Sequence, residues 1–385
     1  MPDLCWRWLQ FTLRWMRLLD RYLLRELLVP LGYCLSGFLI FWVAFNLFSE
    51  MGEFQDNKLH GGDILQYYVM RVPEFLVIVL PIALLLALLY TLTSLARHQE
   101  ITAIRAAGVS MWRLSMPYFF VGLAASLCLF ALNEFCVPKT AEQAERIFNR
   151  RVQRPKKGAI PTSGLANLRE KRTWFAGQYD PKTSEMLNPQ ILWTLPDGSQ
   201  FWLFASRARR ISGVWTFFDA RQYTATSETN SMLAPSLQTN VLAVPQFRET
   251  PEEIQSEIDI SKGMSLHGRN KADIPISQIL NYLRLHPRPP DSIKPWLYTK
   301  LHGRLAVPWT CLVVVLIATP LGAFSGRRNV FVGVASSIVI CFIYFVLQQF
   351  ALALGTSGYV ASWIAAWFPN LTFGLAGLCM MTRVR

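Results

Sequence analysis

Six long stretches of the chain contain no charged residue, and they constrain its fold more than any other feature. They are Leu27–Phe48, Phe75–Ala96, Leu114–Leu132, Leu305–Phe324, Val330–Leu354 and Tyr359–Met381. A helix needs about 20 apolar residues to cross the hydrocarbon core of a bilayer, whereas a buried strand needs only about 4 to 8. The sequence therefore predicts a polytopic α-helical membrane protein, with three spans before a long hydrophilic segment and three after it.

The distribution of Lys and Arg predicts which side of the membrane each connection occupies. The first 26 residues contain five arginines, and the turn after the second span contains Arg97, Arg105 and Arg113. The segment 49–74 contains only two basic residues against five acidic ones. Since short cytoplasmic connections carry an excess of Lys and Arg, we expect both termini in the cytoplasm and the large segment 137–304 on the outside.

The N-terminal segment 1–26 combines its arginines with Trp6, Trp8 and Trp15. Trp and Arg together are typical of the membrane interface, so an interfacial amphipathic helix that leads into the first span is predicted. A charged segment that only sets the orientation of that span is the alternative. The predicted domains are thus 1–26, spans 1–3 in 27–136 with a short cytoplasmic helix at 97–108, the outer domain 137–304, and spans 4–6 in 305–385.

The outer segment has the pattern of a small β-domain with flanking helices. It opens with a helix-like stretch, 139–151, and a second helix is predicted at 276–285. Between them lie short aromatic stretches of strand character, at 173–179, 190–195, 201–205 and 214–218, and the segment 196–199 (Pro-Asp-Gly-Ser) is a hairpin signal. This spacing favours a β-jellyroll-like or sandwich domain, and the absence of cysteine from 137–304 means that no disulfide holds it together.

The chain lacks the motifs of several enzyme classes. It has no G-x-x-x-x-G-K-[ST], H-E-x-x-H or C-x-x-C motif, and its five histidines are scattered, so no catalytic residue, metal site or cofactor is predicted. Gly355-Thr-Ser-Gly358 resembles an intramembrane protease motif, but no histidine follows His302 to act as the base. The spans carry Asn and Gln rather than ionisable groups, which disfavours an ion-coupled transporter and suits polar contacts between helices.

A net charge of +13 points to anionic partners. Six cations and no acid occur within 146–157, starting with Arg146, Arg150 and Arg151. Arginine binds phosphate through paired hydrogen bonds, and this cluster follows the outer mouth of a span, so contact with lipid headgroups is predicted. A solvated charge run is the alternative. Nucleic acid is not expected as a partner, because the cluster is predicted to lie outside the cytoplasm.

The cytoplasmic turn after the second span has the features of a docking element. A helix from about Arg97 to Ala107 is predicted to end at Gly108 in a left-handed conformation, and Ser110 can cap the next span. Ile101 and Ile104 would share one face of it, with Glu100 and Arg105 alongside. Such an apolar ridge flanked by charges suits a groove in another protein, although an interfacial helix lying on lipid is the alternative.

This turn, Glu100-Ile-Thr-Ala-Ile-Arg-Ala-Ala-Gly-Val-Ser110, resembles the coupling segment of the LptF/LptG (YjgP/YjgQ) permease family of the lipopolysaccharide export system. Other segments resemble the family in the same order and cover nearly the whole chain. They are Asp20-Arg-Tyr-Leu-Leu-Arg-Glu26, Val72-Pro-Glu74, Leu80-Pro81, Pro138 with Glu142-Gln143, Phe345-Val-Leu-Gln-Gln349, Gly355 and Ala366-Trp-Phe-Pro-Asn370.

The resemblance implies a non-catalytic permease subunit of an ABC-type lipopolysaccharide transporter in the inner membrane of a Gram-negative-type bacterium. It implies a paralogous LptF/LptG partner, two copies of an LptB-like ATPase that binds the ATP, and a periplasmic β-jellyroll that works with LptC and LptA. The implied ATPase-coupling residues are Glu100, Ile101, Ile104 and Arg105, the implied headgroup contacts are Arg146, Arg150 and Arg151, and the implied lining of the lipid cavity in spans 1 and 5 is Phe45, Phe342, Phe345 and Gln349.

One feature departs from the family, and one rival function remains. Some members carry lysine at the outer end of span 1, where this chain has Phe45-Asn46 and then Glu50, so headgroup contact from span 1 is not predicted. The rival is a scaffold protein that is coupled to an ATPase, transmits its motion to the outside and moves no lipid.

Overall fold

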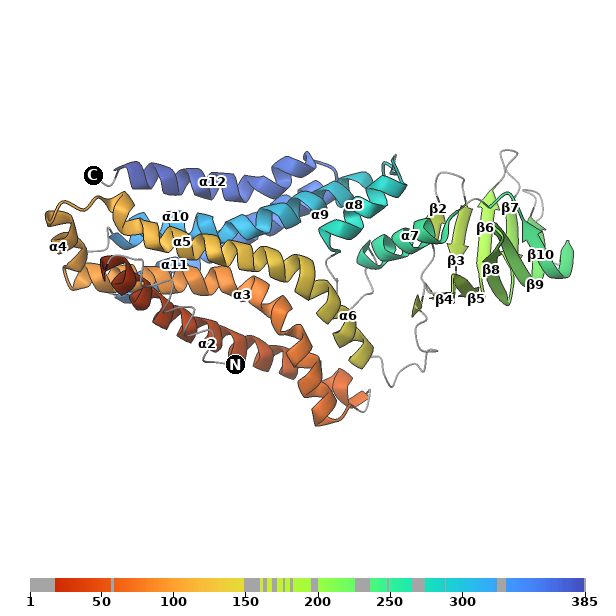
Figure 1. Cartoon of the computed structure of the whole chain (residues 1–385), viewed down its shortest axis with the longest axis horizontal. Helices are drawn as coiled ribbons and strands as arrows, with labels where there is room; N and C mark the ends of the chain where they lie inside the picture. Colours follow the sequence, from red (N-terminus) through yellow and green to blue (C-terminus); the bar gives the residue numbers. More distant parts are fainter. Residues whose placement is uncertain are drawn as a thin grey trace. The chain divides into compact units, whose positions relative to one another are not determined.

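The long apolar runs form helices (Figure 1), and most of these spans are longer than the charge-free segments. The computed structural model describes residues 18–56, 59–148, 160–161, 165–167, 172–175, 177–180, 183–194, 200–225, 236–247, 249–264, 274–287, 289–323 and 330–383. The chain divides into two compact units. The first, Met1–Ile147 with Pro295–Arg385, is called here the helical unit, and the second, Phe148–Lys294, is called the β-domain.

The helical unit contains the membrane spans. Its elements are α2 (Leu18–Asp56), α3 (Gly61–Arg97), α4 (Glu100–Ala106), α5 (Met111–Ala131), the π-helical turn η1 (Leu132–Cys136), α6 (Val137–Phe148), α9 (Lys294–Ala306), the 3-10 turn η2 (Val307–Trp309), α10 (Thr310–Ala323), α11 (Val330–Thr356) and α12 (Ser362–Arg383). Within the described residues, six helical segments are long and apolar enough to cross a membrane. This confirms the six predicted spans.

The charge-free runs underestimate the lengths of these helices, because the helices extend past the charged residues that end the runs. With 37 residues, α3 is about 55 Å long, against about 30 Å for the hydrocarbon core. Arg71 lies within α3 and Arg304 within α9, and they are only 9% and 7% exposed. A charged residue thus ends an apolar run in the sequence without ending the helix.

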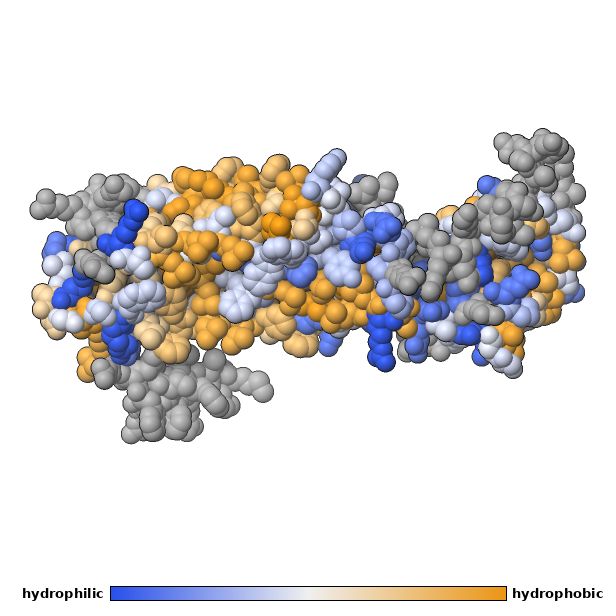
Figure 2. Space-filling view, turned by 90° about the horizontal axis from the view of Figure 1, so that it is seen from above, coloured by the Kyte–Doolittle hydropathy of each residue, from blue (hydrophilic) through white to orange (hydrophobic). Residues whose placement is uncertain are grey.

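The spans differ in how deeply they are buried within the chain. In their most apolar windows, 67% of residues are buried in α3 and 67% in the span that contains α10, against 11% in α2 and 17% in α11. One hydrophobic core joins α3, α5 and α10 with the first turns of α2. Helices α2 and α11 both pack against α3. Because they have the smallest buried shares, they are called here the peripheral spans. Figure 2 shows hydrophobic residues over much of the surface of this unit.

The β-domain is a curled antiparallel sheet, as predicted. In its described part, ten strands follow the order β1-β4-β5-β8-β9-β7-β6-β3-β2, and β10 pairs with β9. Their bounds are β1 (Ile160–Pro161), β2 (Leu165–Asn167), β3 (Arg172–Phe175), β4 (Gln178–Asp180), β5 (Glu185–Leu187), β6 (Gln190–Thr194), β7 (Gln200–Phe204), β8 (Arg207–Ile211), β9 (Val214–Ala225) and β10 (Leu237–Val244).

The strand predictions hold with one correction. The pairing of Thr194 with Gln200 confirms the β6–β7 hairpin. The predicted strand 173–179 is instead two strands, because β3 pairs with β2 and β6 while β4 pairs with β1 and β5. One predicted strand therefore serves two separate parts of the sheet.

Two helices complete the β-domain, α7 (Pro251–Met264) and α8 (Ile276–Leu285), and the bounds of α8 are those predicted. Ile254 and Ile258 of α7 join Trp174, Trp215 and Phe217 of the sheet in one core. Alternate residues along each strand point into this core. The aromatic stretches seen in the sequence therefore supply its interior side chains, including Trp174, Trp215 and Phe217.

The bounds of three predicted segments differ from those of the structure. Helices α6 and α9 belong to the helical unit, so the β-domain covers 148–294 rather than 137–304. The predicted helix 139–151 is described as far as Phe148. Of the predicted N-terminal helix, 1–17 lies outside the described residues, and 18–26 is the start of α2. Arg150 and Arg151 also lie outside the described residues.

Candidate functional site

The α4 turn is a short helix between two left-handed residues. The structure corrects its predicted start at Arg97: α3 ends there, Gln99 has φ of 62°, and α4 begins at Glu100. Gly108 has φ of 85°, as predicted, and the Ser110 hydroxyl accepts a hydrogen bond of 3.3 Å from the amide of Arg113. Two interruptions of the helical hydrogen bonding therefore set α4 apart from α3 and α5. In Figure 1 it lies at one end of the bundle, together with the end of α12.

The four predicted coupling residues lie in different environments on α4. Ile101 is only 5% exposed and packs into the core of the chain, and Ile104 is half-buried against the same core. Glu100 is half-buried, and Arg105 is exposed. The surface that α4 presents outward therefore consists mainly of Thr102, Ala103, Arg105 and Ala106, while Ile101 anchors the helix to the bundle.

Helix α2 is joined to this turn by polar contacts that sequence reasoning missed. The Tyr22 hydroxyl donates a hydrogen bond of 2.8 Å to Glu100 Oε2. Asp20 accepts one of 2.7 Å from Arg113 Nη2. The partners are 78 and 93 residues apart, so no local pattern could reveal them.

The predicted cavity-lining residues lie on the two peripheral spans. Phe45 of α2 is 62% exposed and Phe342 of α11 is 69% exposed. Gln349 is exposed as well, whereas Phe345 is half-buried. Other large apolar side chains extend both exposed faces, namely Ile40, Phe41 and Phe48 on α2 and Ile338, Ile343, Val346 and Phe350 on α11. Apolar faces of this size are suited to acyl chains or to other membrane helices.

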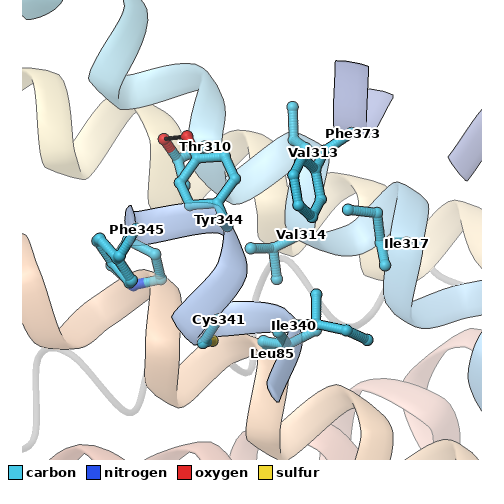
Figure 3. A pocket seen from close by; sticks show the side chains of 11 residues that line it. Leu85, Thr310, Val313, Val314, Ile317, Ile340, Cys341, Tyr344, Phe345 and Phe373 are labelled. Atoms are coloured by element: carbon cyan, nitrogen blue, oxygen red, sulfur yellow. Dashed lines mark hydrogen bonds between the residues drawn. The ribbon is translucent and has the colours of Figure 1, made fainter. Parts of the chain in front are cut away.

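Phe345 points into a small cavity between α3, α10, α11 and α12 (Figure 3). Its volume of about 20 Å³ is room for about one water molecule, so this cavity cannot take an acyl chain. Beside it, the Tyr344 hydroxyl contacts Thr310 Oγ1 at 2.8 Å and donates to Asn370 Oδ1 at 2.6 Å. Asn370 in turn donates to the carbonyl of Ala306 at 2.7 Å. Asn370 therefore makes a polar contact between helices, as expected of the Asn and Gln residues in the spans.

At the ends of α2 and α3 that are far from α4, Arg71 contacts two acidic residues, Glu50 of α2 and Glu74 of α3. Its guanidinium contacts Glu50 Oε1 and Glu74 Oε2 at 3.1 Å each, and Nη1 donates to the Tyr67 hydroxyl at 2.9 Å. Glu50, which stands near the position where some family members have lysine, is therefore paired within the chain. Because Arg71 is shared with Glu74, it offsets only part of the negative charge of the two carboxylates.

The predicted headgroup residue Arg146 lies on the exposed face of α6. Its Nη2 contacts Glu142 Oε1, one helical turn away, at 2.7 Å, and its side chain is 74% exposed. An exposed pair of this kind contributes little to stability, so Arg146 can exchange Glu142 for another anion. Among the described residues, no group of three or more His, Cys, Asp or Glu could hold a metal ion.

Comparison with known families agrees with this arrangement. A family described as "Lipopolysaccharide export system permease LptF/LptG" matches residues 21–383. The match includes the α4 turn, both peripheral spans and the β-domain. No individually curated protein matches the chain. With six apolar spans and a family match over nearly its whole length, the chain is an integral membrane protein that belongs to the LptF/LptG family of lipopolysaccharide export permeases.

Proposed function

We propose that this chain is a transmembrane permease subunit of an ABC-type transporter. It extracts lipopolysaccharide from the inner membrane and passes it to a periplasmic β-jellyroll bridge, and a separate cytoplasmic ATPase supplies the energy. The observation that carries the proposal is the pair of peripheral spans, α2 and α11, which expose aromatic faces in a chain of this family. Both termini lie in the cytoplasm, and the β-domain lies in the periplasm.

The physical task explains why apolar faces and an external source of work are both needed. Removing an acyl chain from the bilayer costs about 0.8 kcal/mol per CH₂. The faces around Phe45 and Phe342 replace part of the lost apolar contact, and the buried core of the β-domain would receive the chains afterwards. The remaining work enters through α4, which presents Arg105 and its exposed neighbours to the ATPase.

We also propose the partners that the family implies. The cavity that Phe345 lines holds about one water molecule, so it is not the lipid site, and a second subunit would complete that site. A paralogous LptF/LptG chain would face α2 and α11, two copies of an LptB-like ATPase would bind the α4 side, and LptC and LptA would continue the β-domain. The headgroup phosphates would contact Arg146, and we propose the same role for Arg150 and Arg151 of the same basic stretch of sequence.

A reconstituted transporter tests the coupling role of α4. The chain, its paralogue and the ATPase are placed in proteoliposomes with lipopolysaccharide, and ATP-dependent release to a soluble acceptor is measured. Glu100→Arg is expected to reduce release by about tenfold or more, the effect of losing about 1.4 kcal/mol or more of coupling. The matched control is Glu252→Arg, at an exposed position on α7 of the β-domain. Undiminished release by Glu100→Arg would remove the coupling role.

Photocrosslinking separates transport from the rival scaffold role. A photoreactive phenylalanine analogue replaces Phe45 or Phe342 on the peripheral spans, and the control replaces Phe368 on α12, which is 44% exposed. The proposal expects lipopolysaccharide adducts at 45 and 342 well above those at 368. Equal labelling at all three positions would favour a protein that moves no lipid.

A further inference from the structure

The start of α2 is held by polar contacts to α4 and α5 on one side and by the hydrophobic core on the other. On one side, Tyr22 Oη donates to Glu100 Oε2 at 2.8 Å, and Asp20 Oδ2 accepts from Arg113 Nη2 at 2.7 Å. The Asp20 side chain is only 10% exposed. A charge-assisted hydrogen bond at a partly buried carboxylate is stronger than one in water, so this contact fixes the start of α2 to the start of α5.

On the other side, the same turns of α2 are packed into the core. Leu23 and Leu27 are fully buried and belong to the hydrophobic cluster that contains Ile101 of α4. The hydroxyl of Thr91 in α3 also donates to the carbonyl of Glu26 at 3.0 Å. Polar contacts to α4 and α5, the hydrogen bond from α3 and apolar packing therefore hold one short stretch of α2 in the bundle.

The helical backbone of α4 is not continuous with that of the neighbouring helices. Gln99 and Gly108, at its two ends, have left-handed backbone conformations that interrupt the helical hydrogen-bond series. A force on α4 therefore does not travel along one continuous helix into α3 or α5. The hydrogen bond between Glu100 and Tyr22 leads instead to α2, whose apolar window is the least buried of the six spans.

We propose that Tyr22 and Asp20 are positioning residues: Tyr22 makes the start of α2 move together with α4, and Asp20 keeps this stretch within reach of α4 by holding it to the start of α5. A displacement that the ATPase imposes on α4 is then delivered directly to the peripheral span that lines the lipid site. This inference rests on the proposed function, because it assumes that α4 receives the ATPase and that α2 contacts the lipid.

The test compares two rates in the same proteoliposomes that contain the chain, its paralogue and the ATPase. ATP hydrolysis and lipopolysaccharide release are measured together for the double variant Asp20→Asn with Tyr22→Phe. We expect hydrolysis within about twofold of wild type and release per ATP reduced by about tenfold. The matched control carries Tyr33→Phe and Asp56→Asn, two changes of the same type on the exposed face of α2.

Two results would overturn the inference. One is an unchanged ratio of release to hydrolysis in the double variant. The other is a proportional loss of both rates, which indicates damaged structure rather than lost coupling. Restoring the ion pair in the reversed sense, with Asp20→Arg and Arg113→Asp, is expected to recover a large part of the release that Asp20→Arg alone abolishes.

A distance measurement separates this inference from the proposed function. Spin labels at Ala106 and Leu28, both exposed, report the separation of α4 and α2 with and without nucleotide. We expect one narrow distance distribution in both states of the wild type and a broad one in the double variant. A wild-type distance that changes with nucleotide refutes the inference even if transport occurs. A wild type that shows a fixed distance but no release refutes the proposed function alone.

Discussion

Arg304 of α9 donates a hydrogen bond of 2.8 Å to the main-chain carbonyl of Asn133, in the π-helical turn that follows α5. Its guanidinium also lies 4.0 Å from the carboxylate of Glu134. The helices α5 and α6 lead the chain into the β-domain, and α9 follows it. The contact therefore joins the outgoing and returning connections, across 171 residues of sequence. A π-helical turn disturbs the regular i to i−4 bonding, which is why a main-chain carbonyl can accept a side-chain donor here.

Replacing Arg304 should destabilise the chain. Arg304→Gln leaves the buried carbonyl of Asn133 and the carboxylate of Glu134 without this donor, and breaking a buried charged contact costs about 2 to 4 kcal/mol. Thermal unfolding of the detergent-purified full chain is the measurement. The control is Arg25→Gln on the exposed side of α2, and equal midpoints for the two variants would contradict the prediction.

Close packing of α12 on α10 should make Gly377 intolerant of any side chain. A Cβ at this position would lie 2.9 Å from the main-chain carbon and oxygen of Leu316, and backbone cannot move aside cheaply. Small residues allow this approach between membrane helices. Gly377→Ala is expected to cost about 1 to 3 kcal/mol, measured as the shift in thermal midpoint.

Gly374 offers the matched control on the same helix. A Cβ there would lie 3.9 Å from Val313 Cγ2, an ordinary contact. Alanine has the higher helix propensity, by about 1 kcal/mol, so Gly374→Ala should leave the midpoint unchanged or raise it. A loss as large as that of Gly377→Ala would show that packing on Leu316 is not the cause.

The hydroxyl of Tyr344 should contribute measurably to stability because it joins three helices. Tyr344→Phe leaves Asn370 Oδ1 and the Thr310 hydroxyl without their shared partner inside the bundle. Such a loss costs about 1 to 3 kcal/mol. The control Tyr90→Phe removes a hydroxyl from a residue that is 45% exposed and should change the thermal midpoint little, so similar shifts for both variants would refute the prediction.

The β-domain should lose stability as the pH rises through the pKa of His286. Burial lowers this pKa, but the hydrogen bond and charge of Glu257, whose Oε1 lies 3.4 Å from Nε2, outweigh burial, so the pKa is raised above 6.5. The Tyr282 carbonyl and the more distant Glu253 act in the same direction. The folded state therefore favours the charged imidazole. The stabilisation is fully present below the unfolded pKa, about 6.5, and is lost as the pH rises through the raised value.

Thermal unfolding between about pH 5.5 and about pH 8.5 measures this dependence in the full chain. The midpoint of the wild type should fall relative to that of His286→Gln across this interval, and Glu257→Gln should remove most of the difference. His98→Gln, at an exposed position, is the control. A constant difference between wild type and His286→Gln would exclude the ion pair as a source of stability.

The six spans and the inserted sheet could be predicted because their signals are local. An apolar run of about 20 residues has few alternatives to a membrane helix, and the bounds of α8 follow directly from its pattern. The split of 173–179 into β3 and β4 could not be predicted, since it depends on which strands each half meets. The lengths of α3 and α9 were underestimated for a similar reason. Arg71 and Arg304 end the charge-free runs, but they are buried within the helices because distant partners pair with them or accept their hydrogen bonds.

The α4 turn shows where sequence reasoning about the site ends. Gly108 and Ser110 were assigned correctly, because a left-handed glycine and a helix cap have local signatures. The side on which Ile101 packs was not decided by the sequence, since an apolar ridge suits the core of the chain as well as a partner's groove. Its burial and the contact between Tyr22 and Glu100 emerge only when segments 78 residues apart meet.

The attachment of α2 at both of its ends has a mechanical consequence. Asp20 and Leu23 hold its first turns, and Glu50 and Phe54 hold its last. Between Leu31 and Phe54 the described side chains are exposed or half-buried, and Cys34, Leu35 and Phe38 are half-buried against the core. Pro30 also removes one helical hydrogen bond near the start of this stretch. Under the proposed function, such a helix would admit a bulky molecule sideways by increasing its curvature while both of its ends stay attached. The stiffness of residues 30–50 would then set how wide the gap becomes, and hence how many acyl chains pass at once.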